Sequence, residues 1–380
     1  MIYNDLLVNK RVINQLVNFY KNNKIQNAYI FHGQEGVGKE AHAIEFFAMI
    51  NCENNLEDYS ACRKCNSCLK IQTLQHELLS ITLPMPRHKV MSRNDSPLKG
   101  LNQKQIDDYT NQLKLKGQKP YFKVKLDNAN TILINSIKEI KKSIQLSIQP
   151  NKYKLHLILD AEKLCYPKAE PANALLKILE EPSENNFFIL VVSDISKILD
   201  TIKSRCTTIF FNSIQIEDNF KYLLNNNIDE QNAKIISKLS FGNISYSMAV
   251  SDNFDEKISK LYKLMQSLFN NDLIKWKKEF SLIKEKNKIF ETLNFILLFL
   301  RDIHTLKLSN NNNSIVFNNF EKDMIKISQK YSFDINQCYN TINNTINNIN
   351  ANGYPPLMIT GLFFELNYLL NNKKNLLKVS

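Results

Sequence analysis

The sequence predicts a doubly wound α/β domain built on a parallel sheet, followed by an all-helical region. Three observations support this prediction. A short apolar strand at residues 28–32 leads into a glycine-rich loop and then a helix. Apolar strands at residues 154–160, 187–192 and 207–211 alternate with helical patterns, which is typical of a parallel sheet buried on both faces. From Glu217 onward only helical patterns remain.

Length and composition indicate a protein of several domains without a membrane span. The chain has 380 residues, of which 43% are hydrophobic, enough for two or three cores. Apolar runs such as residues 295–300 are too short to cross a bilayer. The N-terminus lacks the apolar core of a secretory signal, so we expect a cytoplasmic protein. The net charge of +12 leaves two explanations open, an anionic partner such as nucleic acid or a general bias towards Lys, Asn and Ile.

The loop after the first strand has the spacing G-x-x-x-x-G-K of a phosphate-binding P-loop. Gly33, Gly36 and Gly38 would let backbone N–H groups converge on phosphate oxygens, and Lys39 would add a positive charge. P-loop NTPases have Ser or Thr after this lysine as a ligand of Mg²⁺, whereas this chain has Glu40. Because a carboxylate there repels the phosphates, it disfavours productive binding of ATP with Mg²⁺. The intact glycines leave open the alternative that Lys39 binds a phosphate or ADP without hydrolysis.

Four cysteines follow the next helix, which the spacing of Phe46, Phe47 and Ile50 predicts to be amphipathic. Four thiolates can close a tetrahedron around Zn²⁺ in a structural site. An iron–sulfur site would need a cysteine where Gln72 stands, and buried unrelated thiols do not fit the polar residues between the cysteines. The sequence therefore predicts structural zinc on four ligands: Cys52, Cys62, Cys65 and Cys68.

The next region contains a second strand and a long polar segment. Residues 76–83 have the pattern of a strand. Residues 84–120 are polar and basic, and Pro97, Gly100 and Gly117 interrupt them, which predicts an insertion or a mobile loop.

The strand at residues 154–160 ends in an aspartate, as does the strand that holds Mg²⁺ through water in P-loop NTPases. An acidic residue ordinarily follows and activates the attacking water, but here Ala161 follows Asp160. In an extended chain Glu162 would point to the opposite side. The alternative is an active ATPase in which Glu40 ligates Mg²⁺ and Glu162 acts as the base.

With these residues in view, the chain resembles the gamma, tau and delta-prime family of bacterial DNA polymerase III clamp-loader subunits, in the AAA+ superfamily. The likeness is strongest to its delta-prime members. It lies in the four-cysteine module, in the segment at residues 169–194 and in Ser204-Arg205-Cys206. It implies three domains: an AAA+ RecA-like P-loop domain at residues 1–213 with the zinc module at 52–68, a helical lid at 214–252, and a helical oligomerisation collar at 253–380.

The resemblance also implies a role. Gamma and tau are ATPase motors, whereas delta-prime is a stator that has lost this activity. Glu40, Ala161 and Tyr246, the last where the motors have a sensor arginine, indicate the stator. Arg205 would then reach into the ATP site of a neighbouring subunit, while the alternative for Arg205 is a cation that satisfies helix-terminal carbonyl groups.

The partners implied are the gamma or tau and delta subunits of a hetero-pentamer, with the sliding clamp and primed DNA contacted through the complex. A zinc-module nucleic-acid binder is a weaker alternative. Only Arg63 and Lys64 are cations between the clustered cysteines of that module, and no aromatic platform accompanies them.

Overall fold

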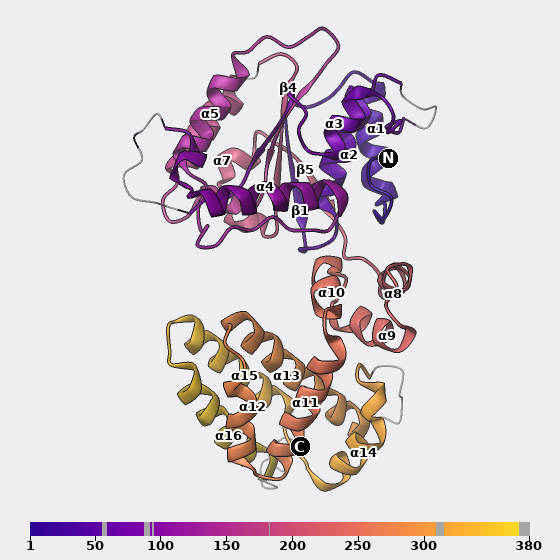
Figure 1. The fold of residues 1–380 in the computed structure, drawn as a ribbon, viewed down its shortest axis with the longest axis vertical. Helices are drawn as coiled ribbons and strands as arrows, with labels where there is room; N and C mark the ends of the chain where they lie inside the picture. The colour runs from indigo at the N-terminus through magenta and orange to yellow at the C-terminus, as the bar shows by residue number, and fades with distance from the viewer. Residues whose placement is uncertain (55–58, 87–91, 93–94, 182, 309–314, 372–380) are drawn as a thin grey trace. The chain divides into compact units, whose positions relative to one another are not determined.

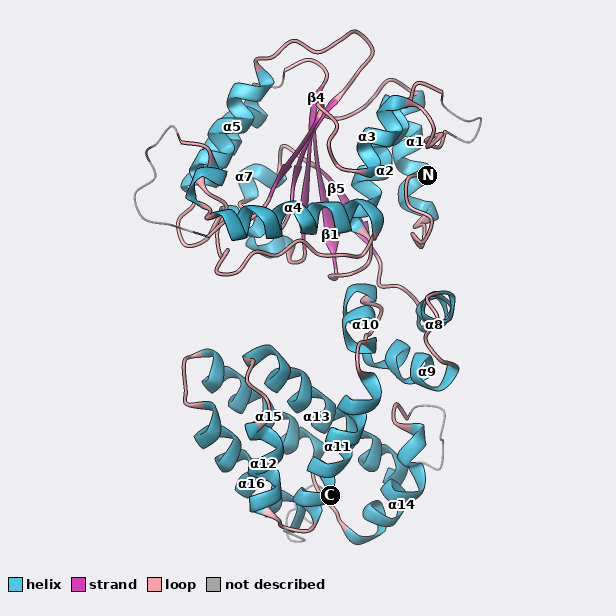
Figure 2. Cartoon of the chain, viewed as in Figure 1, coloured by secondary structure: helices cyan, strands magenta, loops and turns pink. Residues whose placement is uncertain are grey.

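The computed structural model describes residues 1–54, 59–86, 92, 95–181, 183–308 and 315–371. The chain forms two compact units, one of Met1–Asn227 with Ser240–Met248 and one of Ile228–Leu239 with Ala249–Ser380. The first is an α/β unit, and the second is helical throughout its described part (Figures 1 and 2).

A parallel sheet forms the centre of the first unit. Its strands are β1 (Ala28–Gly33), β2 (Leu79–Thr82), β3 (Lys154–Ile158), β4 (Asn186–Val192) and β5 (Thr207–Phe211), in the order β2-β3-β4-β1-β5. Each neighbouring pair is parallel. The predicted α/β fold with a parallel sheet is therefore confirmed. Because β1 lies between β4 and β5, the P-loop begins at the sheet's carboxyl edge, one strand in from the edge strand β5.

Helices cover both faces of this sheet (Figure 2). They are α1 (Lys10–Lys21), α2 (Lys39–Asn51), α3 (Asn66–Gln72), α4 (Gln103–Gln118), α5 (Ile134–Ile144), α6 (Glu170–Glu180) and α7 (Asp200–Lys203). The 3-10 helices are η1 (Pro97–Gly100), η2 (Ala161–Leu164) and η3 (Ile195–Lys197). Alternate side chains of β1 enter two separate cores, Tyr29 and Phe31 on one face and Ala28 and Ile30 on the other.

The prediction that α2 is amphipathic is wrong, because both its inner and its outer face are buried. The chain before α1 lies over the outer face. There Glu45 accepts the backbone N–H groups of Ile2 and Tyr3, each at 2.7 Å, and His42 Nε2 accepts the N–H of Asn9 at 2.9 Å. Polar positions of this helix are therefore buried with hydrogen-bond partners and do not face solvent.

The segment predicted to be an insertion or mobile loop contains η1 and the whole of α4, so the loop prediction is wrong for residues 97–100 and 103–118. Residues 87–91 and 93–94 of that segment lie outside the described residues. The helix begins with a capping box, in which Asn102 Oδ1 accepts the N–H of Gln105 at 2.9 Å and Gln105 Oε1 accepts the N–H of Asn102 at 3.0 Å. Gly117 lies in the last turn, so it does not interrupt the helix.

Acid is expected to weaken the first unit through His156, which is fully buried in β3 and stacks on Phe188. Burial lowers the pKa of His156 to about 4. Since the unfolded chain binds a proton near pH 6.5, this histidine stabilises the fold above that pH and loses its contribution as the pH falls towards 4. Between pH 7 and pH 5 the loss is roughly 2 kcal/mol.

The measurement is the urea midpoint of the first unit at both pH values for the wild type and His156→Phe, which keeps the ring stack. The variant should lose less stability on acidification. Equal losses in the two proteins would show that His156 carries none of the effect.

The remaining helices follow β5. They are α8 (Ile216–Asn225), α9 (Glu230–Leu239), α10 (Ile244–Ser251), α11 (Phe254–Phe269), α12 (Leu273–Ser281), α13 (Lys286–Leu308), η5 (Asn318–Phe320), α14 (Glu321–Lys330), α15 (Ile335–Asn350) and α16 (Pro355–Asn371). The α8 helix belongs to the first unit and α9 to the second. The separate lid and collar domains stay a prediction.

Buried polar contacts tie the second unit together. Trp276 is fully buried, and its Nε1–H donates to the carbonyl oxygen of Ile359 at 3.1 Å. The buried Asp302 accepts the backbone N–H groups of Val316 and Phe317 at 2.7 and 2.9 Å. Among the described helices of the chain, none combines the length and apolar character needed to cross a membrane.

Candidate nucleotide and metal sites

The P-loop lies between β1 and α2, as the sequence predicted. Gly38 has φ +88°, a left-handed conformation that favours glycine, and directly precedes α2. Gly36 has φ +73°, and a Cβ atom there would lie 1.8 Å from Asn243 Oδ1, so only glycine fits this close approach. These positive φ angles explain the glycines of the loop, and Asn243 packs against one of them, Gly36.

The P-loop lysine is turned onto its own loop. Lys39 is 5% exposed, and its Nζ donates to the carbonyl oxygens of Gly33 and Gln34, both at 2.6 Å. Burial is the main cause that lowers the pKa of Lys39 to about 8, with Lys123 acting in the same direction. These contacts direct the ammonium towards backbone oxygens of residues 33 and 34.

Glu40 stands where P-loop NTPases have the Mg²⁺-ligating hydroxyl, and it forms an ion pair with Lys116 of α4. Lys116 is 3% exposed, and its Nζ also donates to the carbonyl oxygens of Pro120 at 3.1 Å and Phe122 at 2.8 Å. The sequence analysis missed Lys116. The capping box at Asn102 and the helical spacing of the apolar residues before Lys116 could have revealed its helix.

Asp160 also has an internal cation as its partner. Its Oδ1 lies 3.2 Å from Lys123 Nζ, and the same ammonium pairs with Glu35. Burial opposes the charge of Lys123, but Asp160 and Glu35 outweigh it, so the pKa of this lysine is raised. Lys123 is a second pocket residue that the sequence analysis missed.

The prediction that Glu162 points away from the site is wrong, because the chain turns into η2 directly after Asp160 and is not extended. Glu162 Oε1 accepts the backbone N–H of Ser193 at 3.4 Å. Burial raises the pKa of Glu162, and its charge acts on Lys39. The carboxyl group therefore lies beside Ser193, a residue that lines the pocket next to the P-loop.

A small pocket is lined by these charged groups except Glu162. Its free volume is about 40 Å³, room for a few water molecules. Mg²⁺ with a nucleotide does not fit these residues as they stand. The two carboxylates at the metal position, Glu40 and Asp160, are already paired with the ammonium groups of Lys116 and Lys123. The lining residues are Glu35, Gly36, Gly38, Lys39, Glu40, Lys116, Pro120, Tyr121, Phe122, Lys123, Asp160, Val191, Ser193 and Ser245.

Arg205 follows α7 and is not among the described residues that line this pocket. Its Nη2 donates to Glu180 Oε1 at 2.7 Å, and its Nη1 donates to the carbonyl oxygen of Thr201 at 2.9 Å. The side chain of Arg205 is 36% exposed. The Thr201 contact agrees with a helix-terminal role, while the exposed guanidinium remains accessible to a neighbour.

Tyr246 lies on α10, and its backbone N–H donates to Asn243 Oδ1 at 2.9 Å.

The four predicted zinc ligands come together before and within α3. The sulfur atoms of Cys52, Cys62, Cys65 and Cys68 all lie within 4.8 Å of one another. The Cys62–Cys68 and Cys68–Cys52 pairs are 4.0 and 3.7 Å apart. A tetrahedral Zn²⁺ with Zn–S bonds of about 2.3 Å requires sulfur atoms about 3.8 Å apart. This donor set fits zinc.

Backbone N–H groups stabilise the thiolate of Cys62, whereas burial raises the pKa values of Cys52 and Cys68. The N–H groups of Cys62, Cys65 and Cys68 point at the sulfur atoms of Cys52, Cys62 and Cys65 respectively, at 3.3 to 3.4 Å. The N–H groups of Lys64 and Cys65 lower the pKa of Cys62 to about 6. Deprotonated sulfur is the form that binds a metal.

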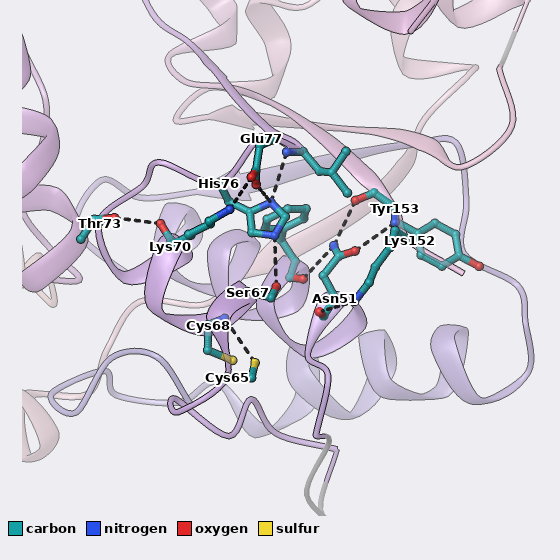
Figure 3. Close-up of polar contacts among 12 residues, drawn as sticks. Asn51, Cys65, Ser67, Cys68, Lys70, Thr73, His76, Glu77, Lys152 and Tyr153 are labelled. Carbon is teal, nitrogen blue, oxygen red and sulfur yellow. Dashed lines mark hydrogen bonds and ion pairs between the residues drawn. The ribbon is translucent and has the colours of Figure 1, made fainter. Parts of the chain in front are cut away.

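The cluster is continuous with the core of the first unit. Figure 3 shows Cys65 and Cys68 beside Ser67 and His76. Cys68 is fully buried on α3, and the neighbouring Ser67 Oγ lies 3.1 Å from His76 Nε2. His76 Nδ1 accepts the N–H of Leu78 at 3.1 Å, so Nε2 carries the proton and donates to Ser67. His76 also packs edge-on against Phe47 of α2. A metal on the cysteines would therefore fix α3 against α2 and β2.

The parallel sheet, the glycine loop after β1 and the helix that follows define a P-loop α/β protein. A family model described as "DNA polymerase III, delta subunit" matches residues 8–215, more than half of the chain. The chain belongs to this family.

Similar proteins carry the names of three subunits of that polymerase. The chain is 26% identical to "DNA polymerase III subunit gamma" of Buchnera aphidicola subsp. Schizaphis graminum, over 89% of this chain and 87% of that protein. It is 25% identical to "DNA polymerase III subunit delta'" of Bacillus subtilis, over 79% and 78%. Proteins named tau also match, including that of Escherichia coli at 21% identity over 65% of this chain and 32% of that one. The chain is therefore similar to proteins named as gamma, delta' and tau subunits.

Proposed function

We propose that this chain is a non-catalytic, delta-prime-like subunit of the clamp loader of DNA polymerase III. It would help to load the sliding clamp onto primed DNA as part of a complex with gamma or tau and delta subunits. The observation that carries the proposal is the Glu40–Lys116 ion pair. It places a neutralised carboxylate where a motor subunit needs a hydroxyl ligand for Mg²⁺.

In this complex Arg205 would act on a neighbour. An arginine that enters another subunit's site stabilises the charge that develops on the transferring γ-phosphate. Arg205 supports such a role because its guanidinium is partly exposed and is held by a surface ion pair with Glu180. Exposed pairs of this kind contribute about 0–1 kcal/mol, so a phosphate can displace Glu180.

The test is ATP hydrolysis by the complex reconstituted with wild-type, Arg205→Ala or Lys39→Ala protein. Loss with Arg205→Ala and near-normal hydrolysis with Lys39→Ala supports the proposed role. Loss that follows Lys39 overturns it.

The second candidate is an active gamma- or tau-like ATPase. The observation that favours it is the position of Glu162, whose charge acts on Lys39 and which could therefore serve as a base. This candidate requires Glu40 to leave Lys116 and ligate Mg²⁺. ATP turnover by the purified chain alone would establish it.

The zinc proposed on Cys52, Cys62, Cys65 and Cys68 would act as a structural cross-link. It would connect the end of α2 with α3 through sulfur ligands. Because the four cysteines would fill all four coordination positions of the zinc, none would be open for chemistry.

The α16 helix is the proposed contact with partner subunits. Exposed apolar side chains recur on it, and at the residue directly before it, at spacings of three and four residues around Gly361: Tyr354, Leu357, Phe364 and Tyr368. A Cβ atom on Gly361 would have nothing within 4 Å, so the middle of the stripe is open space. Such a stripe suits a helix of a neighbouring subunit.

Phe364→Glu is expected to weaken assembly with the partner subunits about tenfold or more, because it buries a charge in an apolar contact. Phe364 is 57% exposed in this chain, so the substitution should leave its thermal stability unchanged. Analytical ultracentrifugation of the mixture measures assembly. Leu308→Glu, at another exposed apolar position, is the control, and an equal effect of both variants would contradict a specific role of α16.

A further inference from the structure

The P-loop pocket of this chain has a balanced set of its own charges. Three ammonium groups and three carboxylates line it: Lys39, Lys116, Lys123, Glu35, Glu40 and Asp160. In a P-loop NTPase the lysine and Mg²⁺ offset the negative phosphates, and the metal also offsets the aspartate at the end of the strand. Here the chain itself provides the offsetting cations.

Lys123 pairs with Asp160, the carboxylate that would hold a metal ion in a P-loop NTPase. Asp160 follows β3, at the carboxyl edge of the sheet, where P-loop NTPases hold Mg²⁺ through water. Lys123 Nζ lies 3.2 Å from Asp160 Oδ1 and pairs with Glu35 of the P-loop as well. One ammonium group thus joins the strand end to the P-loop, as a divalent cation would.

The backbone around Lys123 holds it at this place. Lys116 donates to the carbonyl oxygens of Pro120 and Phe122. The hydroxyl of Tyr121 accepts the N–H of Leu7 at 2.9 Å, and Ser245 donates to the carbonyl oxygen of Tyr121. These contacts fix the segment before the lysine. After it, Gln112 of α4 accepts the backbone N–H of Lys125 at 2.7 Å and donates to its carbonyl oxygen at 3.0 Å. Because Lys116 and Gln112 both belong to α4, this helix is the element that directs Lys123 into the pocket.

We propose that Lys123 is a built-in substitute for the divalent cation of the P-loop site. The ammonium joins Asp160 to Glu35, so the pocket keeps its shape without metal and without nucleotide. This proposal rests on the proposed non-catalytic function and explains how the site tolerates the loss of its ligand. Removing the ammonium should uncover a cation site formed by Asp160 and Glu35.

The test measures Mn²⁺ binding to the full chain by electron paramagnetic resonance, together with the thermal midpoint at increasing Mn²⁺. Lys123→Met is expected to bind Mn²⁺ about tenfold more tightly than the wild type. It should also melt at a lower temperature without metal and regain stability when Mn²⁺ binds the folded state. Lys123→Arg keeps a cation and should behave as the wild type does.

Lys125→Met is the matched control, because Lys125 is an exposed lysine of the same segment. If repulsion between the freed carboxylates unfolds Lys123→Met, the double variant Lys123→Met with Glu35→Gln removes that repulsion and keeps Asp160. It should bind Mn²⁺ more tightly than Glu35→Gln alone. The proposal is overturned if the wild type binds Mn²⁺ as tightly as Lys123→Met, or if neither Lys123→Met nor the double variant gains affinity over its control.

These outcomes are independent of the role of the chain in a complex. The Mn²⁺ measurement uses no partner subunit, whereas the proposed function is tested by hydrolysis in the reconstituted complex. If Lys123→Met gains affinity for Mn²⁺ while Arg205→Ala leaves ATP hydrolysis by the complex unchanged, the inference about Lys123 holds and the role of Arg205 is refuted.

Discussion

Arg205→Ala in this chain is expected to suppress ATP hydrolysis at one neighbouring site of the reconstituted complex. Arginine residues supplied in trans increase the rate of phosphoryl transfer by about 10³ to 10⁵. The site that loses Arg205 should therefore become silent. The total rate should fall by the share that this site contributes in the presence of primed DNA and the sliding clamp.

The guanidinium contacts of Arg205 provide the controls for this experiment. Glu180→Gln removes the ion pair that holds Arg205 in the free chain but leaves the guanidinium in place. Because an exposed pair contributes about 0–1 kcal/mol, Glu180→Gln should change hydrolysis by a few-fold at most. Arg205→Lys should fail to restore the rate, since lysine lacks the planar fork of donors.

Two results would contradict a role of Arg205 in trans. Full activity of the Arg205→Ala complex would leave Arg205 only its contacts within the chain, the Thr201 carbonyl and Glu180, that is, the role of a helix-terminal cation. Loss of complex assembly in this variant would show a structural role, so the amount of assembled complex has to be measured beside its activity.

Cys68→Ser is expected to abolish zinc binding and to destabilise the first unit by roughly 4 kcal/mol or more. Cys68 is fully buried, and its sulfur lies within 4.0 Å of those of Cys62 and Cys52. Without the metal the buried sulfur atoms lose their common partner, and α3 loses its attachment to the end of α2. Zinc content by elemental analysis and the thermal midpoint with and without a chelator measure the effect.

Cys165→Ser is the control for Cys68→Ser, because Cys165 lies outside the four-cysteine cluster. This control should keep both the zinc and the sensitivity to a chelator. A wild-type protein that contains no zinc after purification in zinc-supplemented medium, and whose thermal midpoint a chelator leaves unchanged, would refute the metal site.

The sequence was sufficient where the signals were local. The P-loop strand, glycines and helix are contiguous, and the remaining strands are short apolar runs, so their order along the chain predicted the parallel sheet. The cysteine spacing likewise predicted a cluster that the structure brings together. The α4 helix was missed because Pro97, Gly100 and Gly117 were interpreted as breakers, although they lie before the helix or in its last turn.

Contacts between distant segments could not be predicted. Lys123 and Glu35 are 88 residues apart, and their pairing depends on how α4 and the following segment lie over the P-loop. The burial of α2 on its outer face has the same cause, since residues before α1 cover it. The turn after Asp160, which brings Glu162 towards Lys39, is set by the backbone of η2 and not by an apolar pattern.

Trp276 gives this chain a spectroscopic reporter of one unit alone. It is the only tryptophan of the sequence. It lies fully buried on α12 in the helical unit, where its ring contacts Phe280 of the same helix and Phe363 of α16. Its emission will change when that unit unfolds and will not register melting of the α/β unit. Comparing fluorescence with circular dichroism therefore separates the two transitions in the unmodified protein, without dyes or truncation.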